Sequence, residues 1–308
     1  MEDTKVHSKR APFFDRQLRL LKQEYVWYLF LAPTIITIIL MTYVPLVKTL
    51  SLSMFTSRNG TYENFVGLLN YINILTDQHF WNALLNTLYI GLFVLLLNIP
   101  ISFVLACMIN SLKYCKNLYK SLYFLPNVTS VVAITIIFRY MFHPSAAGTI
   151  NYFLGSFGLG PYGWLNDPAM SKWVVIIMAV WHGVGYNIII WLAGLQSIPQ
   201  EMYEAATVDG ANMLQKWRYI TIPLSRPIFV FMLIMGTMDA LRRFSDVWTL
   251  GGSTGSPLRS LQTIVTYFYD KGMLAGQYGV GAAAAVIIFV LIMTITSLNL
   301  VVTNKKDA

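Results

Sequence analysis

Long hydrophobic runs separated by polar segments dominate the chain. Runs that reach the roughly 20 residues needed to cross a bilayer lie near residues 26–47, 84–109, 121–142, 173–195 and 280–302. One more run, near 226–248 and therefore the fifth in chain order, is apolar only in its first half. The pattern predicts an all-α membrane protein with six transmembrane helices in a domain over residues 25–304, preceded by a separate segment of residues 1–24.

The composition agrees with this pattern. Hydrophobic residues make up 56% of the chain and charged residues only 12%, whereas soluble domains carry about 25% charged residues. This balance excludes an ordinary cytosolic enzyme. The four His residues are scattered, so no metal site and no catalytic constellation is predicted, and Cys107 and Cys115 lack metal-ligand spacing and are interpreted as packing residues.

The positions of Lys and Arg predict the orientation of the helices. They gather in residues 1–24, in the loops after the second and fourth runs, and at the end of the chain. Because loops rich in Lys and Arg stay on the cytoplasmic side, we expect both termini in the cytoplasm. The net charge of +8 then follows from topology and from contact with anionic membrane lipid, and it requires no nucleic-acid partner.

Within residues 1–24, apolar and basic positions alternate from Phe13 to Lys22. This alternation suits an amphipathic helix on the inner membrane surface, and a solvated tail is the alternative. The first apolar run reaches span length and lacks a small-residue cleavage site before the next polar stretch. We therefore expect it to remain as the first helix and not to be removed as a signal peptide.

The polar segment between the fourth and fifth runs follows the local rules of a helical hairpin. Ser197 and Gln200 have the spacing of a capping box, which predicts a helix over about 198–208. Gly210 can adopt the positive φ that ends a helix, and residues 211–220 can form a second helix before Pro223. Two short helices joined by a glycine turn should therefore project into the cytoplasm.

The same segment resembles the "EAA loop" of ABC importer permeases. The match consists of Glu204-Ala205-Ala206, then Gly210, then Ile220-Thr221-Ile222-Pro223 at the family's spacing. The resemblance implies a type I ABC importer permease fold in which loop 197–223 docks into a separate ATPase subunit; a plain connecting loop is the alternative. The ATPase-coupling residues implied are Glu204, Ala205, Ala206, Asp209, Gly210, Trp217 and Pro223, with Trp217 standing where the family commonly has a Phe that fits a pocket of the ATPase.

The residues that flank this segment narrow the resemblance. Gly194-Leu195-Gln196-Ser197-Ile198-Pro199 and Val208-Asp209-Gly210-Ala211 are similar to the carbohydrate branch of binding-protein-dependent importers, which includes maltose, glycerol-3-phosphate and oligosaccharide permeases. This implies a multi-pass subunit of a prokaryotic inner membrane that transports a sugar. The implied partners are a second, homologous permease forming a heterodimer, two ABC ATPase subunits and an extracytoplasmic solute-binding protein.

ATP hydrolysis is assigned to the partner subunits. The glycine-rich run of residues 251–256 lacks the Lys that a phosphate-binding loop requires. We therefore expect this chain to be no enzyme and to bind no cofactor, with ATP and Mg²⁺ held by the ATPase subunits. A permease for another solute, such as a phosphorylated polyol, is an alternative, and an ion-coupled secondary transporter is less favoured because no internal repeat is visible.

Candidate substrate contacts occur in the second half of the fifth run. Asp239, Arg242, Arg243 and Asp246 would share one stripe if the helix continued through them. Ionisable groups inside a membrane are unfavourable unless they are paired or face a cavity. These residues either neutralise one another as ion pairs packed against neighbouring helices or line the substrate path. In the substrate path, the two arginines would slightly favour an acidic or long oligosaccharide.

A second group of candidates lies in the fourth run, where Trp181, His182, Tyr186 and Asn187 surround two glycines. Aromatic faces beside hydrogen-bonding groups suit a sugar, because its C–H faces stack and its hydroxyls need partners. The alternative is a packing cluster in which the glycines let helices approach closely. Asn98-Ile99-Pro100 and Pro126-Asn127 are expected to mark kinks in the second and third spans, and they are weaker candidates for substrate contact.

Overall fold

The computed structural model describes residues 13–58 and 60–304, and it places the side chains of residues 25–58 and 60–301. Over this described range the chain is helical, and its strand-like contacts are two isolated bridges, Phe55 with Phe65 and Arg58 with Gln277. The predicted all-α class is confirmed. The chain divides into two compact units, which meet in sequence between Ser51 and Leu52.

The first unit contains the first predicted span. Its helix starts with α1 (Phe13–Ile38), passes through the π-helical segment η1 (Ile39–Tyr43) and continues into α2 (Val44–Leu52). Residues Tyr25–Leu52 are long and apolar enough to cross a membrane. The side chains of the predicted amphipathic segment, residues 1–24, lie outside the described part, although its backbone is helical from Phe13 onward.

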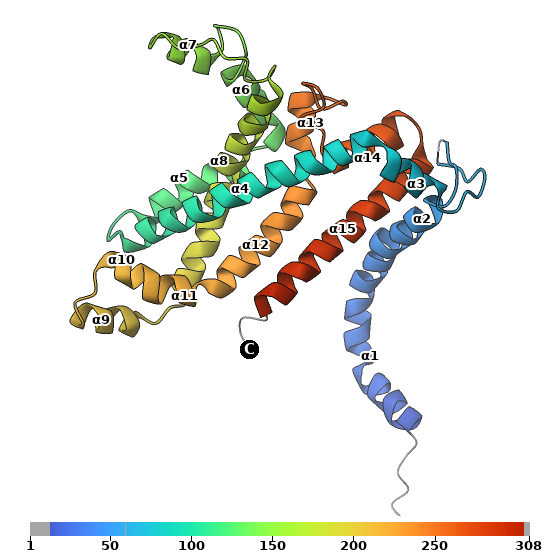
Figure 1. Ribbon diagram of the computed structural model, residues 1–308. Helices are drawn as coiled ribbons and strands as arrows, with labels where there is room; N and C mark the ends of the chain where they lie inside the picture. Colours follow the sequence, from blue (N-terminus) through green and yellow to red (C-terminus); the bar gives the residue numbers. More distant parts are fainter. Residues whose placement is uncertain (1–12, 59, 305–308) are drawn as a thin grey trace, which may run out of the picture. The chain divides into compact units, whose positions relative to one another are not determined.

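Three long helices form the frame of the second unit (Figure 1). They are α4 (Gln78–Ser111), α8 (Pro168–Leu195) and α15 (Tyr278–Asn304). Together with the helix of the first unit, they give four helices that could each cross a membrane. α4 lies between α8 and α12 (Arg226–Leu241), and α12 in turn packs against α15.

Two further spans are broken helix pairs. α5 (Lys116–Val128) and α6 (Val131–Met141) meet at a bend of 90°, and the segments Met213–Leu224 and Arg226–Gly251 meet at 64°. The number of spans is therefore four, or up to six if each bent pair crosses as one span. The break after α5 follows Pro126, where the sequence predicts a kink, because a proline ring prevents regular helical hydrogen bonding.

The fifth span differs from the sequence prediction, which extends one helix through residue 246. α12 ends at Leu241, and α13 (Ser245–Gly251) starts after a break in which Phe244 has φ −139° and ψ −62°. The break frees the Arg243 carbonyl from helical hydrogen bonding, and the Thr263 hydroxyl donates to that carbonyl at 2.9 Å. The continuous-helix prediction is wrong because a distant threonine satisfies the interrupted backbone.

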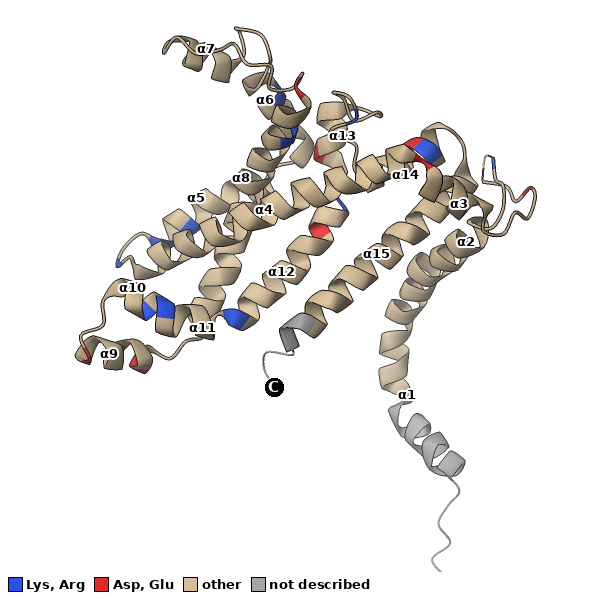
Figure 2. Ribbon diagram, in the orientation of Figure 1, with Lys and Arg blue, Asp and Glu red and all other residues tan. Residues whose placement is uncertain are grey.

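Short helices occupy both ends of the second unit. At one end lie α9 (Gln200–Val208), α10 (Met213–Lys216), the π-helical η2 (Trp217–Thr221) and α11 (Ile222–Leu224). The opposite end holds α3 (Leu69–Thr76), α7 (Thr149–Gly155), α13, α14 (Ile264–Tyr269) and the π-helical η3 (Asp270–Leu274) (Figure 1). Charged side chains concentrate at these two ends, and the acidic position within α12 is Asp239 (Figure 2).

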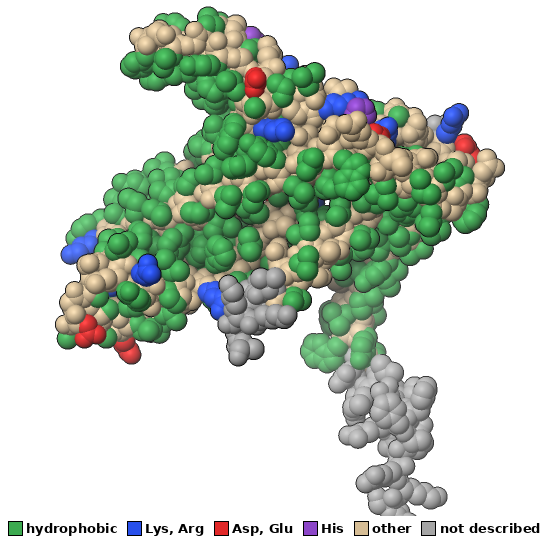
Figure 3. All heavy atoms as spheres, in the orientation of Figure 1, with side chains coloured by type: hydrophobic (Ala, Val, Ile, Leu, Met, Phe, Trp, Pro, Cys, Tyr) green, Lys and Arg blue, Asp and Glu red, His purple; other side chains and the backbone are tan. Residues whose placement is uncertain are grey.

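Hydrophobic side chains cover the helices between the two ends (Figure 3). Leu85, Leu96 and Leu125 are 57–64% exposed, and further apolar side chains along α4, α5 and α12 are also exposed. A soluble monomer rarely exposes apolar patches of this extent. The surface therefore fits the hydrocarbon environment that the sequence predicts.

Candidate functional site

The segment after α8 forms the predicted helical hairpin. α9 and α10 are joined at Gly210, whose φ of +76° is the left-handed conformation expected of a glycine turn. The second helix is longer than predicted: it runs from Met213 through η2 and α11 to Leu224, and it therefore includes Pro223. The hairpin lies at one end of the second unit (Figure 1).

The cap of the first hairpin helix differs from the prediction. α9 begins at Gln200 after Pro199, and no side chain caps it. The Ser197 hydroxyl donates to the Gly194 carbonyl at 2.7 Å, so it serves the end of α8. The predicted capping box at Ser197 is wrong, and a capping box formed by Asn212 and Gln215 instead opens the second helix.

Side-chain bonds brace the two arms of the hairpin. The Lys216 ammonium donates to the Thr207 hydroxyl at 2.7 Å, and the hydroxyls of Tyr203 and Thr221 are 3.0 Å apart. Both bonds connect α9 to the second helix. The Tyr203 ring also packs against a buried cluster that includes residues of α8. The hairpin is therefore fastened to the membrane helices and can move with them as one body.

The predicted coupling residues divide between surface and interior. Exposed members are Glu204, Ala205, Asp209, Gly210 and Pro223, whereas Ala206 and Trp217 are partly buried against the cluster at the end of α8. The Trp217 ring lies 6.1 Å from the Phe103 ring of α4. This contact fixes η2 to α4, so Trp217 packs inside the chain in this structure.

Two apolar side chains at the tip of the hairpin were missed by sequence reasoning. Val208 is 89% exposed and Leu214 is 74% exposed. They flank the glycine turn, where polar residues usually occur. Apolar residues beside a turn in an otherwise polar segment are the signal that could have found them.

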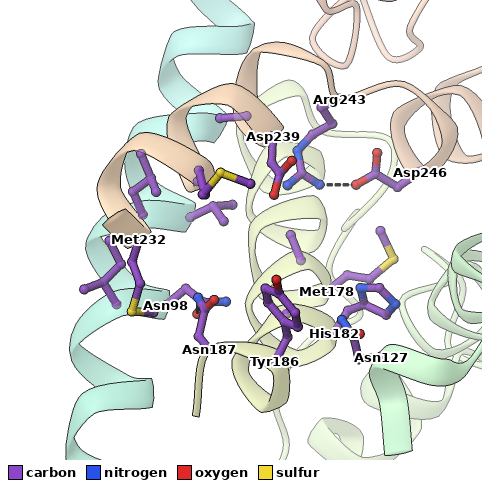
Figure 4. Close-up of a pocket in the computed structure, with 18 of the residues that line it drawn as sticks. Asn98, Asn127, Met178, His182, Tyr186, Asn187, Met232, Asp239, Arg243 and Asp246 are labelled. Carbon is purple, nitrogen blue, oxygen red and sulfur yellow. Dashed lines mark hydrogen bonds and ion pairs between the residues drawn. The ribbon is translucent and has the colours of Figure 1, made fainter. Parts of the chain in front are cut away.

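A cavity of about 580 Å³ with a mixed apolar and polar lining lies between the membrane helices. Its walls come mainly from α4, α8 and α12, with further residues from α5 and α6, and the break between α12 and α13 closes one end (Figure 4). The polar residues that line it are Asn98, Asn127, His182, Tyr186, Asn187, Asp239, Arg243, Ser245 and Asp246. Its volume is typical of a site for a small molecule.

The predicted stripe of the fifth span is only partly brought to this cavity. Asp239, Arg243 and Asp246 line it, but Arg242 is exposed outside the lining. The helix break separates the two arginines and allows Arg243 to form an ion pair with Asp246. The stripe thus contains an internal ion pair and also faces a cavity, and its contact with substrate stays a prediction.

The candidates of the fourth span divide in the same way. His182, Tyr186 and Asn187 line the cavity, whereas Trp181 lies on another face of α8, with its ring 5.7 Å from that of Phe138. The packing interpretation holds at Gly185. A Cβ atom there would lie 1.9 Å from the Tyr123 carbonyl oxygen of α5.

Amide side chains connect the cavity wall across α4 and α8. Asn187 donates to the Asn98 side-chain oxygen at 2.5 Å, and Asn98 donates to the Val180 carbonyl at 3.3 Å. Nε2 of His182 and Nε of Arg243 are buried and have no hydrogen-bond partner within the described part of the chain. Buried polar groups without partners are unfavourable. A ligand that accepts a hydrogen bond from Nε of Arg243, and that bonds to the His182 ring nitrogen as its tautomer requires, would therefore stabilise the site.

Asn98 and Asn127 were expected chiefly as markers of kinks. Asn127 comes from the last turn of α5, next to Pro126, and Asn98 lies two residues before Pro100 in α4. Polar amides inside apolar spans are the signal for a cavity, because such groups need hydrogen-bonding partners away from lipid. The cavity thus presents amides, a phenol, an imidazole, carboxylates and a guanidinium, which together suit a ligand with many hydroxyls.

Comparisons with known proteins agree with these features. Residues 98–306 match the family model described as binding-protein-dependent transport system inner membrane component. The chain is 33% identical to the arabinooligosaccharide transport permease AraP of Bacillus subtilis, over 89% of this chain and 87% of that protein. It is 34% identical to the lactose transport permease LacF of Rhizobium radiobacter, over 87% of this chain and 91% of that protein.

A solved structure shares the fold. The crystal structure of a bacterial ABC transporter involved in the import of the acidic polysaccharide alginate contains a chain that aligns with a TM-score of 0.84 and 26% identity, covering 94% of this chain and 99% of that one. A second structure, of the alginate transporter in complex with its alginate pentasaccharide-bound periplasmic protein, aligns with a TM-score of 0.83 and 25% identity. The chain is a multi-pass membrane protein and belongs to the family of binding-protein-dependent transport system inner membrane components.

Proposed function

We propose that this chain is the permease subunit of an ATP-driven importer that carries a sugar, specifically an oligosaccharide, across the inner membrane of a prokaryote. The observation that carries the proposal is the group of polar side chains in the cavity between α4, α8 and α12. Amide, phenol and imidazole groups at membrane depth offer hydrogen bonds to hydroxyls. The ring of Tyr186 offers an apolar face for a sugar ring.

The relatives support the choice of a sugar. AraP and LacF are named for arabinooligosaccharides and lactose, and both align over most of this chain. A trehalose/maltose permease of Thermococcus litoralis is also 29% identical over 87% of the chain. A phosphorylated polyol is less favoured, because no cluster of basic groups lines the cavity to receive a phosphate.

In the proposed assembly the chain crosses the membrane six times, and each bent helix pair forms one span. Both termini and the α9–α11 hairpin then lie in the cytoplasm, as the distribution of Lys and Arg favours. A second, homologous permease, two ATPase subunits and an extracytoplasmic binding protein complete the transporter. ATP and Mg²⁺ are held by the ATPase subunits.

The hairpin would transmit motion from the ATPase to the membrane helices. Its internal bonds and its packing against α8 make it rigid, and Val208 and Leu214 offer an apolar contact surface. Exposed Glu204 and Asp209 could pair with basic groups of the partner. Because α8 carries three of the polar residues that line the cavity, His182, Tyr186 and Asn187, displacement of the hairpin would move these side chains.

Reconstitution with the partner subunits tests the transport function. The complete transporter in proteoliposomes should hydrolyse ATP faster when a cognate sugar and its binding protein are present, and it should accumulate that sugar. A transporter with inactivated ATPase subunits is the control and should do neither. Uptake that continues without ATP hydrolysis would reject the proposal and favour an ion-coupled transporter.

Substitution at the hairpin tip tests the docking surface. Leu214→Glu places a charge on the proposed apolar contact and should reduce co-purification of the ATPase by about tenfold, because a charge buried without a partner weakens an interface strongly. Leu258→Glu is the matched control, since Leu258 lies between α13 and α14 and is 88% exposed. Equal co-purification of both variants would place the ATPase contact elsewhere.

A further inference from the structure

The charged residues that line the cavity do not balance. Asp239 and Asp246 are acidic, and Arg243 is the basic residue of the lining. Counting His182 as neutral, the lining carries a net charge of −1. This result follows from the position of Arg242, which lies outside the lining.

The positive charge of Arg243 is already engaged. Its guanidinium forms an ion pair with Asp246, and the two side chains are only 15% and 7% exposed. The Asp246 carboxylate also accepts a hydrogen bond from the Val247 backbone N–H at 2.9 Å, which holds it in place. A substrate carboxylate would have to compete with this buried partner for the guanidinium.

Asp239 is the carboxylate of the lining that stays open to a ligand, although the positive charges of Arg243 and Arg242 lie close enough to attract it. It makes no hydrogen bond or ion pair with any residue in the described ranges, and it is exposed where it lines the cavity. Figure 4 places its carboxylate beside the cavity together with Arg243, above Tyr186 and the amides of Asn98 and Asn187. A carboxylate can accept hydrogen bonds but cannot donate them when ionised.

We infer that the cavity selects a neutral, hydroxyl-rich saccharide and disfavours an acidic one, with Asp239 as the residue that makes this distinction. Its carboxylate would accept hydrogen bonds from sugar hydroxyls, and it would repel the carboxylate of a uronic acid or a phosphate group. The inference rests on the proposed sugar transport. It reverses the sequence-based expectation, which counted both arginines as substrate contacts and slightly favoured an acidic sugar.

The inference also separates this chain from its solved neighbours. Those transporters are described as importing acidic alginate, and they share its fold over nearly the full length. A shared fold leaves charge selection free to differ, because selection depends on a few side chains in the cavity. The replacement of one charged residue should therefore alter the preference for neutral over acidic sugar without altering the fold.

A matched pair of sugars tests this. The neutral oligosaccharide that most strongly stimulates the reconstituted transporter is compared with its derivative oxidised to a uronic acid at the primary hydroxyls. Binding of both to the permease–ATPase complex in nanodiscs is measured by saturation-transfer NMR without the binding protein, so that only the membrane site contributes. Asp239→Asn removes the charge and keeps the shape, and Glu63→Gln removes one charge from an exposed position away from the cavity.

The wild-type complex should bind the neutral sugar about tenfold more tightly than its oxidised derivative, as one unfavourable like-charge contact implies. Asp239→Asn should remove most of this preference, and Glu63→Gln should retain it. The inference is overturned if the wild type binds both sugars equally, if an acidic sugar is the strongest stimulator, or if Asp239→Asn keeps the full preference. Failure of every sugar to stimulate the transporter would instead reject the proposed function.

Discussion

At Gly185 the backbone of a neighbouring helix leaves no room for a side chain. Gly185 lies on α8 where α5 crosses, and a Cβ atom would meet the carbonyl oxygen of Tyr123 at 1.9 Å, its carbonyl carbon at 2.5 Å and Cα of Phe124 at 2.9 Å. All three atoms belong to backbone. A side chain can rotate away from a new methyl group, but a helical backbone must move as a body.

The required movement is large enough to measure. Ordinary contact between non-bonded heavy atoms begins near 3.5 Å, so Gly185→Ala forces α5 away from α8 by about 1.5 Å. Overpacking of this kind typically lowers stability by 1–3 kcal/mol, and the backbone contact puts this variant at about 3 kcal/mol. With an unfolding entropy of about 2.1 cal/mol/K per residue over 308 residues, such a loss corresponds to a fall in Tm of about 5 °C.

The control is a glycine with open space around it. A Cβ atom at Gly155, in α7, would meet nothing within 4 Å, and its φ lies outside the left-handed region. Gly155→Ala should therefore leave Tm unchanged or raise it slightly, because alanine lowers the entropy of the unfolded chain. The assay is the fraction of detergent-solubilised protein that stays monodisperse after heating, measured by fluorescence-detected size-exclusion chromatography.

The displacement should also appear in function. α5 carries Asn127, which lines the cavity, so a shift of α5 should weaken sugar-stimulated ATPase activity in the Gly185→Ala complex at temperatures where the protein stays folded. A variant that melts within about 2 °C of Gly155→Ala and keeps full stimulation would refute the close backbone contact between α5 and α8 on which this reasoning depends.

Two further predictions concern the two ends of the protein. Tyr203→Phe removes the hydroxyl that bonds across the hairpin, so it should lower stability by about 1 kcal/mol and reduce the amount of sugar transported per ATP hydrolysed. The control is Tyr219→Phe, at a residue that is 71% exposed, which should change neither quantity. An equal ratio of sugar to ATP in the two variants would show that the Tyr203–Thr221 bond is not needed for coupling. At the opposite end, burial alone would raise the pKa of Asp77, but hydrogen bonds from Lys271, the His79 backbone and Tyr267 hold that pKa below its ordinary value of 3.8. This stabilisation is fully present above the ordinary pKa of Asp77 and is lost as the pH falls through its lowered pKa in the folded protein. The Tm of Asp77→Asn should therefore fall less than the Tm of the wild type between pH 5 and pH 3. Parallel profiles of Tm against pH for the two proteins would contradict this.

The sequence predicted the parts of the fold that depend on local pattern. Hydrophobic run length located the three long helices of the second unit, and Gly210 located the turn of the hairpin, because span length and positive φ are properties of short segments. The kink at Pro126 was found for the same reason. The comparisons also confirm the family that the Glu204–Pro223 segment suggested.

Errors occurred where a distant residue decided the local structure. The end of α12 depends on Thr263, which is 20 residues from the carbonyl it satisfies, and the start of α9 depends on Ser197 bonding back to α8. Helical periodicity assumes that the helix continues, so it could not reveal either event. The positions of Trp181 and Trp217 likewise depend on partners in α6 and α4.

The break after α12 connects these errors to the proposed selectivity. A continuous helix would have presented both arginines along one stripe. The lining would then have carried no net charge, or it would have favoured an acidic sugar. The helix ends at Leu241, Arg242 lies outside the lining, Arg243 pairs with Asp246, and Asp239 has no ion pair among the described residues. The Thr263 hydroxyl, which bonds to the Arg243 carbonyl at this break, is therefore expected to influence the proposed selectivity. Thr263→Val, which removes that hydroxyl while keeping the side-chain shape, should therefore weaken the preference for neutral sugar as well as the stability of the break, and an unchanged preference would separate the helix break from substrate selection.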